Sequence, residues 1–241
     1  MKLQKVTNPS LQLHGRWYDD ACGTAFALEL LGERWSLLIV RELMFGGRRF
    51  SDLRASLPGI SARVLTERLA GLETAGVVRR SKLAQVPGVQ VYELTEWGHK
   101  ADSALMELGR WAAMSQHHNP TLPLSPASLM MSFRTMFDAR LAGKRTLVGV
   151  IVVGLESFTV TISDGKLAIR RGRADAAHFT LIAPDAMSLA AVVYGKVSLA
   201  ALGHLEVQGD EAAMQTYVDL FHLPKNRLTP SLDVADNRAA Q

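Results

Sequence analysis

The segment from residue 26 to residue 94 constrains the fold most, because residues that start or break helices divide it at short intervals. Apolar residues at helical spacing predict a first helix and then a second over Trp35–Leu43. Gly46-Gly47 fits the C-terminus of the second helix, where a left-handed backbone is needed. Phe50 begins a third short helix, which Pro58-Gly59 ends.

A fourth helix is expected after this break. Ser61 is placed to cap it, with Ile60 and Leu65 as a hydrophobic staple, and Gly76 ends it. Two strands should follow, over residues 77–83 and 89–94, around a turn at Pro87-Gly88. Helix, turn, helix and then a β-hairpin is the layout of a winged helix-turn-helix.

Positive charge is concentrated in the same segment. From Arg34 to Lys82 there are ten Lys or Arg and four Asp or Glu residues, a net charge of +6, whereas the whole chain carries +4. Neutralising phosphates supplies most of the sequence-independent affinity for DNA. A run of charge is more often a solvated face, but its coincidence with the helix-turn-helix pattern favours DNA binding.

Several separated blocks stand in this order along the chain: Cys22, Ala27–Ile39, Arg49–Leu53, Pro58–Ser61, Val64–Leu69, Tyr92–Thr95 and Gly98. Over roughly residues 20–115 they resemble the HxlR family, bacterial winged-helix transcription regulators that act as dimers. The wing departs from many members, because Gly88-Val89-Gln90 stands where they carry an Arg after the tip prolines.

This layout predicts the residues that contact DNA. Arg63, in the first turn of the fourth helix, opposes the helix dipole, so it is better explained by DNA contact than by stability. The residues expected to face the major groove are Ser61, Ala62, Arg63 and Thr66. Those expected mostly at phosphates are Arg48, Arg49, Arg79, Arg80 and Lys82, and Ser51 is assigned to the same surface.

The whole chain sets further bounds. Its 241 residues suggest one large or two small domains. Residues 1–18 have no apolar stretch typical of a signal peptide, and the longest apolar run, Leu147–Val153, is far shorter than the ~18 residues of a membrane helix. A single Cys excludes an intrachain disulfide and fits a reducing compartment, so a cytoplasmic protein is expected.

Prolines at positions 120, 123 and 126 indicate a linker that is neither helix nor strand. We therefore expect a DNA-binding and dimerisation domain over residues 1–118, a Pro-rich linker over 119–128 and a second domain over 129–241. His117 and His118 are interpreted as solvated, because adjacent residues at a helix end do not converge on one metal ion.

One helix over residues 96–116 is expected between the wing and the linker. Its apolar stripe suits a homodimer interface, which the HxlR resemblance also implies; the alternative is packing within one chain. The residues assigned to dimerisation are Trp97, Leu105, Leu108 and Trp111.

The C-terminal half has the pattern of an α+β domain. Residues 158–163 alternate apolar and polar, Asp164-Gly165 forms a two-residue turn, and the returning strand pairs Ile162 with Leu167 and Val160 with Ile169. Further strands are expected over 148–153, 179–182 and 205–207, with helices over 129–141, 185–194, around 199 and over 210–221. The result is a mixed sheet of about five strands covered by helices.

The motifs from Phe179 through Tyr194-Gly195 and Leu205–Asp210 to Leu220–Pro224 resemble the sterol carrier protein domain. That resemblance implies an α/β fold with an apolar tunnel for hydrophobic ligands. The Met-rich stripe near residue 130 could equally be plain core. The residues assigned to ligand binding are Met130, Phe133, Met136, Phe137, Phe158, Val160, Leu181 and Tyr194.

No catalytic motif, phosphate loop, cofactor motif or metal-ligand spacing occurs, so an enzyme is not expected, and neither is a cofactor or metal. The sequence favours a dimeric repressor that binds an inverted-repeat operator in double-stranded DNA and responds to a small hydrophobic ligand. One alternative is a lipid carrier whose winged domain is a partner platform. The other is a regulator that senses oxidants through Cys22, a position that some HxlR members use in this way.

Overall fold

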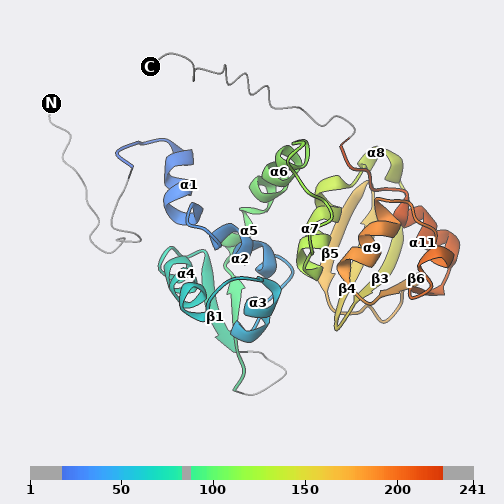
Figure 1. Cartoon of the computed structure of the whole chain (residues 1–241), viewed down its shortest axis with the longest axis horizontal. Helices are drawn as coiled ribbons and strands as arrows, with labels where there is room; N and C mark the ends of the chain where they lie inside the picture. The colour runs from blue at the N-terminus through green and yellow to red at the C-terminus, as the bar shows by residue number, and fades with distance from the viewer. Residues whose placement is uncertain (1–17, 83–87, 225–241) are drawn as a thin grey trace, which may run out of the picture.

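The computed structural model describes residues 18–82 and 88–224, which form a helical part with a two-stranded wing and a part built on a larger sheet (Figure 1). The first part contains α1 (Gly23–Leu31), α2 (Ser36–Leu43), α3 (Phe50–Ser56), α4 (Ala62–Thr74), β1 (Val78–Lys82) and β2 (Gln90–Leu94). The strands β1 and β2 are antiparallel. The predicted winged helix-turn-helix is therefore confirmed.

The expected helix boundaries follow from local chemistry. Ser61 Oγ accepts a hydrogen bond from the Val64 amide at 3.2 Å and caps α4. Gly46 has a φ of 125°, which the chain needs to turn away from α2. Trp35, the first residue of the predicted helix, instead precedes α2 in a left-handed conformation. The Pro87 half of the predicted wing turn lies outside the described residues.

The single helix predicted over residues 96–116 is wrong. The structure has α5 (Glu96–His99) and α6 (Asp102–Ala113), separated at Lys100 and Ala101. The amides of these two residues bond to carbonyls only three residues earlier, which tightens the turn and redirects the chain. Gly98 of α5 packs closely against the backbone of Val77, since a Cβ there would lie 2.2 Å from the Val77 carbonyl oxygen.

The linker also ends earlier than predicted. Pro126 is the first residue of α7 (Pro126–Met136), whose N-cap Ser125 accepts a bond from the Ser128 amide at 3.0 Å. Proline is tolerated there because its missing N–H would have no helical partner. The predicted helix over 129–141 is divided, with α8 (Ala139–Ala142) following α7 as a separate turn.

The second part is a five-stranded mixed sheet in the order β5-β4-β3-β6-β7, with α7, α9 and α11 packed against it (Figure 1). Only the β3–β6 pair is parallel. The predicted pairs Ile162–Leu167 and Val160–Ile169 are confirmed. The remaining elements are β3 (Leu147–Val153), β4 (Glu156–Ser163), β5 (Lys166–Arg171), β6 (Phe179–Ala183), α9 (Ala186–Val193), α10 (Leu199–Leu202), β7 (Glu206–Gly209) and α11 (Glu211–Val218).

Aromatic rings fill the space between the sheet and its helices. Phe133 of α7 lies 4.9 Å from Phe221 and 6.1 Å from Tyr217, measured between ring centroids. The Phe179 ring occupies the space beside Gly149, where a Cβ would lie 2.3 Å from it. Close packing of this kind leaves little tolerance for added volume.

The hydrophobic core continues from one part into the other. Phe45, just after α2, meets Phe158 of β4 edge to face, with centroids 5.9 Å apart. The Arg134 guanidinium of α7 lies over the Phe45 ring at 5.9 Å and forms an ion pair with Asp102 of α6.

Within the described residues, no helix is long and apolar enough to cross a membrane.

Candidate nucleic-acid interface and ligand-binding surfaces

The N-terminal turn of α4 presents the residues expected to read base edges. Ser61, Arg63 and Thr66 are exposed, Ala62 is half-buried, and the Arg63 side chain is 88% exposed. Arg63 Nε donates to Glu67 Oε1 at 2.8 Å, and this carboxylate raises the pKa of Arg63. An exposed pair of this kind contributes little to stability, so the guanidinium can exchange Glu67 for a base or phosphate.

The wing carries two further arginines of the predicted phosphate surface. Arg79 pairs with Glu93 and Arg80 with Glu73, each at 2.9 Å, and Arg80 lies over the Tyr92 ring. Three others from the same predicted set, Arg49, Ser51 and Lys82, are exposed. The structure therefore leaves these five side chains accessible to a polyanion.

Arg48 is a correction to the predicted DNA surface. It is buried, with 7% exposure, and its Nη1 donates to Glu156 Oε2 of β4 at 2.7 Å. Its Nη2 donates to Ser56 Oγ at 2.9 Å. Because its guanidinium faces the second part of the molecule, Arg48 joins the two parts and is not available to phosphates.

The residues assigned to dimerisation divide between two sides of α5 and α6. Trp97, Leu108 and Trp111 are exposed, and Trp111 is 70% exposed. Leu105 is half-buried against the molecule's own core, so its assignment is corrected to intramolecular packing. In Figure 1, α1 and α6 both lie toward the top of the winged part, whereas β1 lies below them.

The predicted ligand-binding residues lie in a packed core. Six of them are buried: Met130, Phe133, Met136, Phe158, Val160 and Leu181. Phe137 and Tyr194 are half-buried, and the Tyr194 hydroxyl is bonded to Ser132 Oγ at 2.7 Å, while burial raises its pKa. None of the eight lines either of the two hollows described below.

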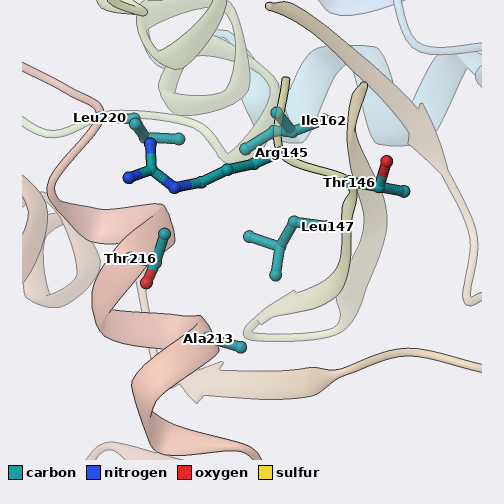
Figure 2. A pocket seen from close by; sticks show the side chains of 7 residues that line it. All are labelled: Arg145, Thr146, Leu147, Ile162, Ala213, Thr216 and Leu220. Atoms are coloured by element: carbon teal, nitrogen blue, oxygen red, sulfur yellow. The ribbon is translucent and has the colours of Figure 1, made fainter. Parts of the chain in front are cut away.

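The first hollow has a volume of about 190 Å³ and lies between the sheet and α11 (Figure 2). Figure 2 shows Leu147 and Ile162 on one side and Ala213 and Thr216 on the other, with the Arg145 side chain reaching toward Leu220. Its lining is mostly apolar, and its size suits only a small group.

The second hollow is a groove of about 1090 Å³ between the two parts. Its walls come from α2, α3, the segment 122–126, the turn between β3 and β4, and the end of β5. Sequence reasoning missed it, because its walls are distant along the chain. Two features of the sequence near the groove were unusual for a packed core: Glu42 stands within the apolar α2, and Leu155 stands at a turn.

Cys22 is exposed and immediately precedes α1. Hydrogen bonds from the backbone of Thr24, and then of Ala25, lower the pKa of its thiol. A lowered pKa increases the thiolate fraction and therefore the reactivity toward oxidants.

No cluster of three possible metal ligands occurs within the described ranges, and His117 and His118 are both exposed.

An exposed basic helix turn, a basic hairpin and a helix-turn-helix core together define a winged helix-turn-helix DNA-binding protein. The family model described as HxlR-like helix-turn-helix matches residues 30–120. The HTH-type transcriptional regulator YodB of Bacillus subtilis is 40% identical over 86 residues, which cover 36% of this chain and 77% of YodB. The chain belongs to the HxlR family of transcriptional regulators, whose members bind DNA and are not enzymes.

Other relatives agree with this assignment. YvaP of Bacillus subtilis, an HTH-type transcriptional regulator, is 43% identical over 86 residues, covering 36% of this chain and 80% of YvaP. Among solved structures, the reduced form of YodB covers 41% of this chain at 35% identity, and oxidised HypR, a redox regulator, covers 40% at 30% identity. The matched regions span 97% of the YodB chain and 100% of the HypR chain, each with a TM-score of 0.37. Because these TM-scores are low, the family assignment rests on the sequence matches.

Proposed function

We propose that this regulator is a cytoplasmic homodimer that represses transcription by binding an inverted-repeat operator. The N-terminal turn of α4 enters the major groove, and the wing arginines contact phosphates. The observation that supports this most is the exposed Arg63 side chain at the start of α4, in a chain whose family consists of DNA-binding regulators. The exposed apolar residues of α5 and α6 form the dimer interface.

We further propose that the C-terminal part is a sterol-carrier-like domain that responds to a small hydrophobic ligand. Its mixed sheet and helix cover support this, and Phe45 and Phe158 give it a direct contact with the winged part. A ligand changes operator affinity only if it binds the two states of the dimer with different affinities. The alternative is a lipid carrier that uses its winged domain only as a platform.

The experiment that tests the DNA-binding proposal selects bound duplexes from a random pool and then measures affinity by fluorescence anisotropy across a salt series. We expect one duplex to bind specifically, and Arg63→Ala to weaken it by about 1–3 kcal/mol. Arg140→Ala, at an exposed arginine of the second part, is the control and should bind as the wild type does. If no duplex is selected, the chain is not a sequence-specific DNA-binding protein. If Arg63→Ala binds normally, α4 is not the recognition helix.

A second candidate function is sensing of oxidants or electrophiles by Cys22. It is favoured by the exposure of the thiol and by the hydrogen bonds that lower its pKa. HypR is described as a redox regulator and one YodB structure as quinone-bound. Because Cys22 is the single cysteine, a quinone should modify one site per chain and weaken operator binding, and Cys22→Ser should abolish both effects. Loss of DNA binding in quinone-treated Cys22→Ser would exclude this mechanism.

A further inference from the structure

The groove between the two parts has a charged floor. Glu156 Oε2 accepts hydrogen bonds from the guanidinium groups of both Arg48, at 2.7 Å, and Arg171. Arg48 Nε and Arg171 Nε and Nη2 are buried and have no acceptor among the described residues. One carboxylate oxygen therefore accepts from two cations, and three buried guanidinium nitrogen atoms have no hydrogen-bond acceptor among the described residues.

The surroundings of Arg171 favour an additional anion. Burial and the nearby charge of Arg48 lower the pKa of Arg171 to about 10, although the charges of Glu42 and Asp52 act in the opposite direction. The Arg171 guanidinium also lies 4.8 Å from the centroid of the Phe158 ring, which provides only a weak acceptor. Arg41, the third arginine of the lining, is already paired with the buried Glu42 at 2.9 Å, and Asp52 lies on the α3 side.

Three exposed leucines lie along the walls of the groove. Leu155, in the turn between β3 and β4, has an exposed fraction of 106%, Leu122 of 60% and Leu38 of 38%. These three leucines come from the second part, the connecting segment and α2, and all line the same groove. A fully exposed leucine at a turn contributes nothing to the core, whereas it would gain from covering an apolar ligand.

We propose that this groove binds a small amphipathic organic anion, with its carboxylate directed to Arg48 and Arg171 and its apolar body along Leu38, Leu122 and Leu155. A volume of about 1090 Å³ is large enough for a ligand with a long chain or several rings. This inference rests on the proposed function and deepens it, because it names the chemistry and the place of the ligand to which the regulator responds.

The position of the groove explains how such a ligand controls DNA binding. One wall is formed by α2 and α3 of the helix-turn-helix, and the other by the sheet of the second part. A molecule bound to both walls favours the arrangement in which they are the right distance apart. Its binding energy is therefore linked to the placement of α4 in the dimer.

The test uses the full-length chain and three probes measured by isothermal titration calorimetry: decanoate, decan-1-ol and acetate. We expect decanoate to bind at least about tenfold more tightly than decan-1-ol, since hydrogen bonds to charged groups are worth that much or more. Acetate, which lacks the apolar body, should show no measurable binding. Equal affinity for decanoate and decan-1-ol, or no binding of decanoate, would overturn the proposal.

Two matched variants locate the site. Leu155→Glu places a negative charge at the mouth of the groove on an exposed residue, so it should reduce decanoate affinity at least about tenfold without unfolding the chain. Leu141→Glu makes the same change at an exposed leucine outside the groove and should bind decanoate as the wild type does. An equal loss in both variants, or in neither, would place the ligand elsewhere.

A further measurement separates this inference from the proposed function. Operator affinity is measured with and without decanoate, whereas calorimetry requires no DNA. If the operator is bound but calorimetry detects no decanoate, the groove proposal fails and the regulator remains. If decanoate binds with the expected selectivity but no operator is found, the proposed function fails and the groove remains a binding site. Decanoate binding that leaves operator affinity unchanged would overturn the regulatory part of the inference.

Discussion

Arg48 and Arg49 are adjacent in the sequence but have opposite environments. Arg48 is buried at 7% exposure and bonded to Glu156, while Arg49 is exposed at the start of α3. The buried guanidinium stabilises the contact between the two parts of the molecule. The exposed one is available to a phosphate. Two arginines that look equivalent in a basic segment therefore have different roles.

Because Arg48 is buried and Arg49 is exposed, their substitutions should affect different properties of the protein. Arg48→Ala should lower the free energy of unfolding by roughly 1.5–3 kcal/mol, because a buried hydrogen bond to a charged group is lost. Arg49→Ala should leave stability within about 0.5 kcal/mol of the wild type and reduce the salt dependence of DNA binding. Urea unfolding and anisotropy measure the two effects. Equal stability of both variants would contradict the buried role of Arg48.

Arg80 belongs to the surface of the wing that we propose contacts phosphates. Its ion pair with Glu73 is half-exposed, so breaking it costs little stability. Arg80→Ala should weaken operator and random DNA alike and lower the slope of log affinity against log salt by about one. Lys166→Ala, at an exposed lysine of β5, is the control. A selective loss of operator binding alone would indicate that Arg80 reads a base.

The two faces of helix α6 have different environments. Leu105 packs inward toward the core, and the same helix contacts α7 of the second part. Leu108 and Trp111 point away and are exposed. The helix therefore connects the proposed dimer interface on one side with the second part of the chain on the other. In the proposed dimer, a shift of α7 would be transmitted to the dimer geometry through this helix.

Leu108→Glu should convert the dimer to a monomer, because a charge buried in an apolar interface costs several kcal/mol without a partner. Specific DNA binding should be lost with it, since an inverted repeat with half-sites about 10 bp apart needs both copies. Ser103→Glu adds the same charge at an exposed polar position of α6 and should remain dimeric. Light scattering that shows an intact Leu108→Glu dimer would exclude this face.

The winged part and the sheet part of the molecule share one hydrophobic cluster. Phe45 and Phe158 meet edge to face, Ser125 Oγ donates to the buried Glu42 at 2.6 Å, and Arg134 reaches both Phe45 and Asp102. Contacts of this kind couple the stability of the winged part to that of the sheet part. The chain should therefore unfold in a single cooperative transition.

Tryptophan fluorescence can test this coupling, because all four tryptophans lie before residue 118. Phe158→Ala, in the sheet part, should lower stability by about 3–5 kcal/mol. The fluorescence midpoint should shift together with the far-UV circular dichroism midpoint. Leu141→Ala, at an exposed leucine, is the control for a surface change. A circular dichroism transition that moves while the fluorescence midpoint stays fixed would show two independent domains.

Features that depend on near neighbours could be predicted from the order of the residues. Ser61 caps α4 through an amide three residues away, and Asp164-Gly165 fixes the register of β4 and β5 because both residues adopt positive φ. The concentration of positive charge and the HxlR motifs likewise appear within one continuous segment. Hydrogen bonds and turn preferences over a few residues are sufficient for such conclusions.

Features that depend on distant partners became visible only in the folded chain. Arg48 is removed from the DNA surface by Glu156, which lies 108 residues further along the chain. Gly98 of α5 packs against the Val77 carbonyl, which lies 21 residues earlier, and the groove exists only where two parts of the chain meet. Periodicity reports which face of an element is apolar, but not which partner covers it. That partner is selected by packing and by the pairing of buried charges over the whole fold.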